Sequence, residues 1–178
     1  MDYLLNKWLG KGWVNISTGL QHAISGTIWE LYTNAFEHGQ SPIGVFSCGQ
    51  HYPTQRELHL TIIDFGQGIP TNVRSLGQNL TLDSDQALQW AFQPGNSTAQ
   101  NGVSRGMGLN LLQRFMIKNH GSLKIFSNDG SVTIKDNEIR YGMHAVDFGG
   151  TLINIAFKCD ESYYCLTSEV KDTHKQWF

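Results

Sequence analysis

The stretch WELYTNAFEHG, residues Trp29–Gly39, sets a polar stripe into a run that otherwise has the pattern of an apolar helix. Glu30, Asn34 and His38 follow one another at intervals of four, and Thr27 precedes Glu30 by three. At about 100° per residue, side chains at these spacings share one narrow sector of a helix. Such a sector must meet water, other polar groups or a ligand, because an unpaired buried carboxylate or amide is costly.

The apolar side of the same helix is equally regular. Its positions, spaced by four, three and four residues, are Ile24, Ile28, Leu31 and Ala35. This periodicity predicts a helix over Ser17–His38 that packs on a core, with Gly39 as its C-terminal stop. Taken alone, the polar stripe is explained by a solvated helix side, so a functional interpretation needs further motifs.

Composition narrows the class of protein. The 178 residues fit one domain, and 40% hydrophobic residues are ordinary for a globular chain. With 13 Lys and Arg against 15 Asp and Glu and no basic block, the charge pattern expected of a nucleic-acid binder is missing. The chain shows no C-x-x-C pair, no signal-peptide pattern and no apolar run of about 20 residues, so we expect a cytoplasmic protein with reduced thiols and no membrane span.

The rest of the chain predicts a layered α+β fold. Strand patterns at 43–49 and 57–64 are expected to pair, and 107–119 has the pattern of an amphipathic helix. Four short β-type runs follow at 122–127, 131–136, 138–143 and 151–158. This order predicts a two-layer sandwich in which helices pack on one face of a mixed, mostly antiparallel sheet.

A long polar connection interrupts these elements. Between Thr71 and Arg105 the only helical pattern is SDQALQWAF, residues 84–92, and such connections in compact domains are usually lids or binding loops. We therefore expect a single domain over 1–178 with a core at about 17–158 and a long mobile lid at about 69–105. Residues 159–178 receive no assignment.

Two glycine motifs accompany the polar stripe. Asp64 ends a strand pattern and is followed by Gly66 and Gly68, which puts a carboxylate beside backbone that can approach a flat ligand closely. An ionised carboxylate accepts hydrogen bonds only, as an exocyclic amine requires. Gly106 and Gly108 open the next predicted helix, where free N–H groups and the helix dipole favour phosphate.

In this order, Glu30-x-x-x-Asn34-Ala35, Asp64-x-Gly66-x-Gly68 and Gly106-x-Gly108-Leu109 resemble the asparagine box and two glycine boxes of the GHKL ATP-binding superfamily. That superfamily includes gyrase, a heat-shock chaperone ATPase, the histidine kinases and the MutL repair proteins. The resemblance covers about residues 20–157, including GGTLINIAF, and its asparagine box is most similar to that of anti-sigma-factor serine kinases. It implies a Bergerat-type sandwich with an ATP lid.

The resemblance implies ATP or ADP as ligand and Mg²⁺ as cofactor. By this likeness Asn34 coordinates Mg²⁺ that bridges the phosphates, and Asp64 binds the adenine amino group. The other implied contacts are His38, Gly66, Gly68, Ile69, Arg105, Gly106, Met107, Gly108, Leu109 and Thr151. His38 is equally explained as a surface residue at a helix end, and Arg105 as a solvated residue rather than a contact of the γ-phosphate or of a partner.

Glu30 separates the branches of the superfamily. In branches resembling gyrase and the anti-sigma kinases, a glutamate here is the general base toward water or a serine hydroxyl, whereas most histidine kinases have asparagine. One turn before the metal ligand, a carboxylate can reach such a nucleophile, although a structural role is the alternative. Glu37 departs from the lysine that many histidine kinases carry near the phosphates. No phosphoacceptor histidine module is evident.

These observations favour a Mg²⁺-dependent ATP-binding domain that transfers the γ-phosphate to a protein serine or threonine, or to water, with Glu30 as base. A second hypothesis is a nucleotide-gated binding module whose lid is ordered by ATP and read by a partner. A third is the ATPase segment of a larger conformational machine. A regulatory protein, additional domains or a second copy of the chain are the expected partners.

Overall fold

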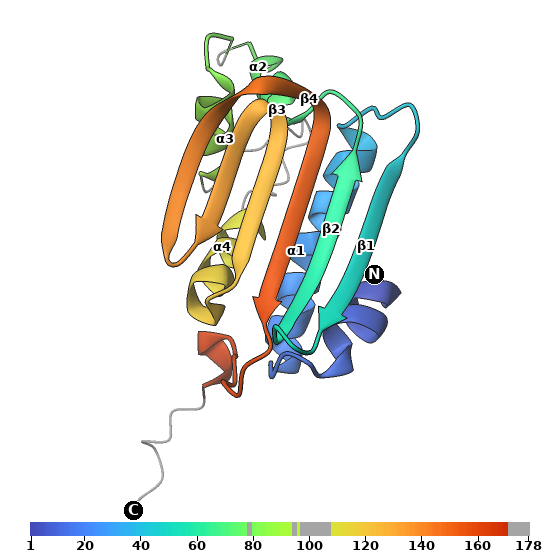
Figure 1. Ribbon diagram of the computed structural model, residues 1–178, viewed down its shortest axis with the longest axis vertical. Coiled ribbons are helices and arrows are strands. Elements are labelled where there is room, and N and C mark those ends of the chain that lie inside the picture. Colours follow the sequence, from blue (N-terminus) through green and yellow to red (C-terminus); the bar gives the residue numbers. More distant parts are fainter. Residues whose placement is uncertain (78–79, 94–95, 97–107, 171–178) are drawn as a thin grey trace, which may run out of the picture.

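The computed structural model describes residues 1–77, 80–93, 96 and 108–170, with only the helical backbone at 108 and 109. The elements are η1 (Tyr3–Trp8), η2 (Leu9–Lys11), α1 (Thr18–Glu37), β1 (Val45–Tyr52), β2 (Glu57–Asp64), α2 (Ile69–Arg74), α3 (Ser84–Phe92), α4 (Gly108–Asn119), β3 (Ser122–Lys135), β4 (Glu138–Lys158) and η3 (Thr167–Glu169). The four strands form an antiparallel sheet in the order β1-β2-β4-β3, and α1, α3 and α4 lie behind it in Figure 1. The two-layer α+β sandwich is confirmed.

The core forms where alternate residues of the two central strands face the helices. In register, Leu58 pairs with Phe157 and Leu60 with Ile155, and all four side chains are fully buried. Successive strand residues point to opposite faces, so these four side chains all lie on the same face of the sheet. The apolar side of α1 packs on this face through buried residues that include Ile28, as its periodicity predicted.

The strands of the last third are longer than expected. The run 122–127 and residues 131–135 of the next run belong to β3, whereas the runs 138–143 and 151–158 belong to β4. The prediction of four short strands is therefore wrong. The register shifts at Asn128 and again before Gly130, which breaks the apolar alternation without ending the pairing. Both strands arch over at the top of Figure 1.

The N-terminal residues belong to the core, which therefore begins before the predicted residue 17. Leu4, Trp8 and Leu9 each have an exposed fraction of 2% or less. The indole of Trp8 packs on Phe157 at 5.3 Å between ring centroids, and its Nε1 donates to the carbonyl of His59 at 2.8 Å. The short helices η1 and η2 thus close one end of the sandwich.

The described part of the C-terminal segment, 159–170, returns to the start of α1. Tyr164 accepts a hydrogen bond from the backbone of Ser17 at 2.8 Å through its carbonyl. The carboxylate of Glu169 accepts from the Ser17 hydroxyl at 2.5 Å and from the N–H groups of Gly19 and Leu166 at 3.2 and 2.8 Å. The carboxylate satisfies the free N–H group of Gly19 in the first turn of α1 and is favoured there by the helix dipole.

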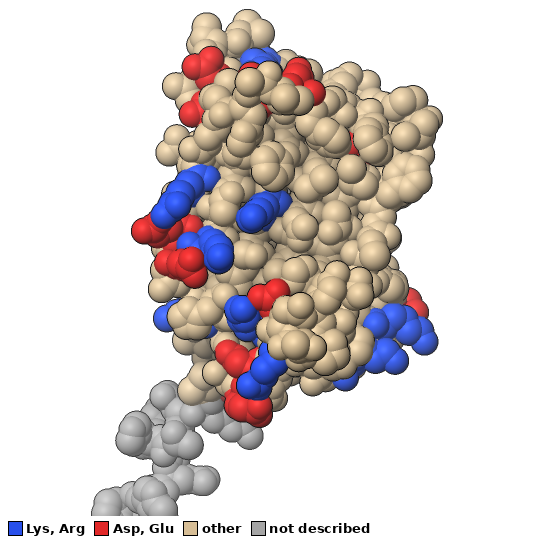
Figure 2. All heavy atoms as spheres, viewed as in Figure 1, with Lys and Arg blue, Asp and Glu red and all other residues tan. Residues whose placement is uncertain are grey.

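The outer face of the sheet carries an apolar row at one end. Phe46, Ile63, Leu152 and Phe126 follow one another in register across all four strands. Phe65 lies beside Phe46, with ring centroids 6.4 Å apart. In Figure 2 the charged side chains gather along the left, the lower part and the top of this face, and the centre and right side are largely uncharged.

Two further expectations can be compared with the structure. Cys48, Cys159 and Cys165 are all free thiols in the structure. Among the helices in the described part of the chain, none has the length and apolar character needed to cross a bilayer.

Phe157→Ala should lower the free energy of unfolding by about 3–5 kcal/mol, because it removes a fully buried ring that contacts Trp8 and Phe115 and leaves a cavity. Phe126→Ala, at a partly exposed position of the outer face, is the matched control and should cost about 1 kcal/mol or less. Urea denaturation of both variants measures the difference, and similar losses would contradict the assignment of inner and outer faces.

Glu169→Gln should destabilise the fold at neutral pH. The Ser17 hydroxyl, followed by the Leu166 N–H, lowers the pKa of Glu169, so its contribution to stability is present above its unfolded-state pKa and is lost as pH falls through the lowered folded-state pKa. The difference between variant and wild type should therefore vanish in acid below the ordinary glutamate range. Denaturant titrations across pH measure this difference in the free energy of unfolding, with exposed Glu161→Gln as control. A difference that does not depend on pH would contradict the stabilising role of the Glu169 carboxylate at the start of α1.

Candidate functional site

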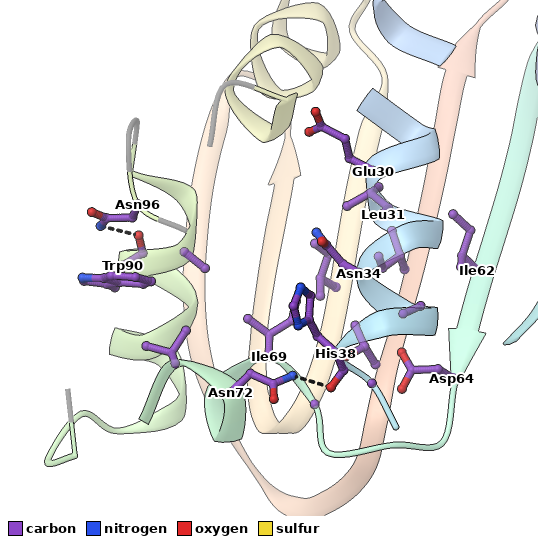
Figure 3. Close-up of a pocket in the computed structure, with 18 of the residues that line it drawn as sticks. Glu30, Leu31, Asn34, His38, Ile62, Asp64, Ile69, Asn72, Trp90 and Asn96 are labelled. Carbon is purple, nitrogen blue, oxygen red and sulfur yellow. Dashed lines mark hydrogen bonds between the residues drawn. The ribbon is translucent and has the colours of Figure 1, made fainter. Parts of the chain in front are cut away.

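A cavity opens between α1, the inner face of the sheet and the helices α2 and α3 (Figure 3). Its floor is a row of three buried isoleucines in register, Ile62, Ile153 and Ile125, one from each of β2, β4 and β3. These branched, apolar side chains form a surface suited to the face of an aromatic ring. The floor therefore follows directly from strand pairing.

The next row on the same face is polar. Asp64, Thr151 and Ser127 are in register on β2, β4 and β3, and all three are buried. Burial raises the pKa of Asp64 above its ordinary value, while hydrogen bonds from the backbone of Gly66 and Thr151 act in the opposite direction. Gly66 donates its N–H to Asp64 Oδ1 at 3.0 Å. A carboxylate is thus held at the end of an apolar floor, with Thr151 next to it on the cavity wall.

The polar stripe of α1 forms one wall of the cavity. Thr27, Glu30, Asn34 and His38 all line the cavity. Figure 3 shows the Glu30, Asn34 and His38 side chains extending from the same side of the helix, with His38 nearest the end that carries Asp64. Asn34 is exposed and Glu30 is half-buried, so both remain accessible to a ligand.

Hydrogen bonds connect α2 and the turn before it to the end of α1. Asn72 donates from Nδ2 to the carbonyl of His38 at 3.0 Å, as drawn in Figure 3, and Gln67 donates its N–H to the carbonyl of Gly39 at 2.7 Å. Gly68, which precedes α2 and lines the cavity, has φ 79°, where an L side chain is strained. This helix, six residues long, was not predicted and lies inside the segment expected to be the lid.

Gly66 does not line the cavity. A Cβ at this position would lie 1.7 Å from the carbonyl oxygen of Gly39, so the absence of a side chain lets two backbone segments touch. The resemblance implied that Gly66 is one of the nucleotide contacts. In the structure it makes room for the turn after α1, and it contributes to the site through its N–H on Asp64.

The opposite wall comes from α3 and contains residues that the sequence did not single out. Trp90 and Asn96 line the cavity, and Asn96 donates from Nδ2 to the carbonyl of Trp90 at 2.9 Å (Figure 3). The helical pattern at 84–92 was recognised, but its capping box at Asp83 and its Trp90 were not connected with a site. The available signal was a large aromatic residue on a short helix inside the predicted lid.

The structure brings most of the predicted nucleotide contacts together. The cavity is lined by Glu30, Asn34, His38, Asp64, Gly68, Ile69 and Thr151. Arg105, Gly106 and Met107 lie outside the described residues, as do residues 78–79, 94–95 and 97–104 of the predicted lid. Gly108 and Leu109 are described only as the first backbone residues of α4.

The donor set fits a divalent ion only in combination with a ligand. Within the part of the chain that the structure describes, no group of three or more His, Cys, Asp and Glu side chains is placed to hold a metal. Asn34 supplies one exposed amide oxygen on the cavity wall. Mg²⁺ keeps several waters and takes remaining ligands from substrate phosphates, so a single amide oxygen suits it.

Comparison with known proteins identifies the family of the chain. The family described as histidine kinase-, DNA gyrase B-, and HSP90-like ATPase matches residues 19–143. Among solved structures, the 43K ATPase domain of Thermus thermophilus gyrase B in complex with an aminocoumarin is similar, with 14% sequence identity and a TM-score of 0.43. The match covers 83% of this chain and 35% of the gyrase chain. A search of curated proteins found no match. Because the family model matches more than half of the chain, the chain belongs to the histidine kinase-, DNA gyrase B-, and HSP90-like ATPase family and contains a GHKL ATP-binding domain.

Proposed function

We propose that this domain binds ATP with Mg²⁺ and transfers the γ-phosphate to a serine or threonine of a protein, or to water, with Glu30 as general base. The observation that supports this most strongly is the arrangement of one cavity. An apolar floor ends at Asp64 and Thr151, and the α1 wall carries Asn34 and then Glu30 progressively further from that end. An adenine ring and a phosphate chain need this order of chemistry.

In this proposal the adenine ring lies on the isoleucine floor. The carboxylate of Asp64, fixed by the backbone N–H of Gly66, accepts a hydrogen bond from the exocyclic amine of adenine. Ile69 and His38 border the same end of the cavity. Because the carboxylate is 3% exposed, its interaction with the amine is shielded from water and therefore discriminating.

Asn34 would hold the ion that accompanies the phosphates. When bound, Mg²⁺ offsets phosphate charge, which is the dominant requirement of phosphoryl transfer. Asn34 lies one helical turn from Glu30 on the same wall, between Glu30 and the end that carries Asp64. This position supports the proposal that Asn34 is the metal ligand. Glu30 is then positioned to accept the proton of a nucleophile directed at the γ-phosphate.

Glu30→Ala should leave ADP affinity within about threefold of wild type and reduce phosphate release from ATP by about 100-fold to 10,000-fold, the range typical for loss of a general base. Calorimetry with and without Mg²⁺ measures binding, and a phosphate-release assay measures turnover. Glu37→Gln, at the exposed end of α1 and away from the cavity, is the matched control and should retain both.

Unchanged turnover in Glu30→Ala would remove Glu30 from the mechanism. Wild-type protein that binds ATP and releases or transfers no phosphate would instead favour the nucleotide-gated binding module, since the cavity would then serve recognition alone. Failure of the wild type to bind either ATP or ADP would contradict the whole proposal.

Asp64→Asn should weaken ADP binding on the order of tenfold to a hundredfold, because it replaces an acceptor oxygen with a donor and removes a charge-assisted hydrogen bond of about 1.5–3 kcal/mol. The wild-type affinity should also fall in acid. Since burial raises the pKa of Asp64, the acceptor is lost at a higher pH than for an exposed aspartate.

Calorimetry of ADP binding from neutral pH downward tests this dependence. The Asp64→Asn variant should lack this titration, and exposed Asp147→Asn should retain both the wild-type affinity and its pH dependence. An Asn variant whose affinity equals that of wild type would show that Asp64 does not contact the base.

A further inference from the structure

Ser127 lies beside the proposed adenine end of the cavity without lining it. It is fully buried on β3 and stands in register with Thr151, which does line the cavity. The large majority of buried hydroxyls are hydrogen-bonded, and the partners of Ser127 show where its proton points. Ser127 has three of them.

The three hydrogen bonds of Ser127 can be satisfied in one way only. The N–H of Ile69 donates to Ser127 Oγ at 2.8 Å, the carbonyl of Gly150 lies at 2.9 Å and the hydroxyl of Thr151 lies at 2.9 Å. A hydroxyl has one proton and two acceptor sites. The Gly150 carbonyl can only accept, so it takes the Ser127 proton, and the Thr151 hydroxyl must donate to Ser127.

This assignment fixes the direction of the Thr151 hydroxyl. Its proton is held by Ser127 on the side away from the cavity, so Thr151 offers only lone pairs to a ligand. The neighbouring Asp64, when ionised, is also acceptor-only. Asp64 and the Thr151 hydroxyl therefore present only hydrogen-bond acceptors at the polar end of the cavity. An amine can donate to these acceptors, whereas a carbonyl oxygen is repelled by them.

We propose that Ser127 is a positioning residue that, by holding the Thr151 proton, makes the site select 6-aminopurine nucleotides against 6-oxopurine nucleotides. This inference rests on the nucleotide site proposed above and adds to it a second discriminating group besides Asp64. Without Ser127, the Thr151 hydroxyl is free to rotate and to donate to a 6-oxo group, so part of the selectivity is lost.

The test compares ADP with inosine diphosphate, which differs at the 6-position of the base, by calorimetry in the presence of Mg²⁺. Wild type should prefer ADP. Ser127→Ala should lower the ratio of the two affinities by about two- to tenfold, the equivalent of one hydrogen bond. Thr151→Val should also lower it, and adding Ser127→Ala to Thr151→Val should lower it no further, because Ser127 acts through that hydroxyl.

The control is Ser131→Ala, which removes another buried hydroxyl of β3, bonded to His144 and away from the cavity, and should leave the ratio unchanged. If Ser127→Ala does not fold, Ser127→Cys fills the same space with a weak hydrogen-bonding group and should give the same fall. A ratio unchanged in the Ser127 variant, or lowered equally in the Thr151→Val background, would overturn the inference. Absence of ADP binding in wild type would overturn the proposed function instead.

Discussion

The antiparallel pairing of β2 with β4 is the constraint on which the cavity depends. Leu58, Leu60 and Ile62 face Phe157, Ile155 and Ile153 across this ladder, and burying these six side chains leaves no freedom of register, since a slip by one residue would turn all of them to the outer face. The same register delivers Asp64 beside Thr151 at the end of the ladder. A polar pair of this kind is tolerated there because backbone N–H groups and Ser127 satisfy it.

The helix α1 connects this ladder to the reacting end of the proposed site. Its apolar side is committed to the core, so its polar sector has a fixed direction, and Asn34 and Glu30 are placed by packing rather than by loops. Both ends of the helix are also held, by Glu169 at the first turn and by Asn72 at the last. The direction of the polar sector is thus fixed by core packing, by the contact at the first turn and by the contact at the last turn of α1.

Much of this arrangement was predictable from sequence, since periodicity specifies which side of a helix is buried and Asp64 ends a clear strand pattern. The residues that were missed depend on information that a local pattern lacks. A helix as short as α2 shows no period, and the bulge at Asn128 looks like a turn between separate strands. The position of Ser127 next to Thr151 follows from a register that joins residues 24 apart. Trp90 reaches the site only through the packing of α3.

The long, arched β4 has a consequence for how this domain can be excised or fused. Similarity to the family ends at residue 143, inside β4, whereas the strand continues to Lys158. Further along the chain, Glu169 contacts the start of α1 through Ser17. A fragment trimmed to the matched segment would retain Glu30, Asn34 and Asp64 in sequence, but it would lack the part of β4, Thr151–Lys158, that pairs with β2. The cooperative unit of folding therefore extends beyond the region in which the family is recognised.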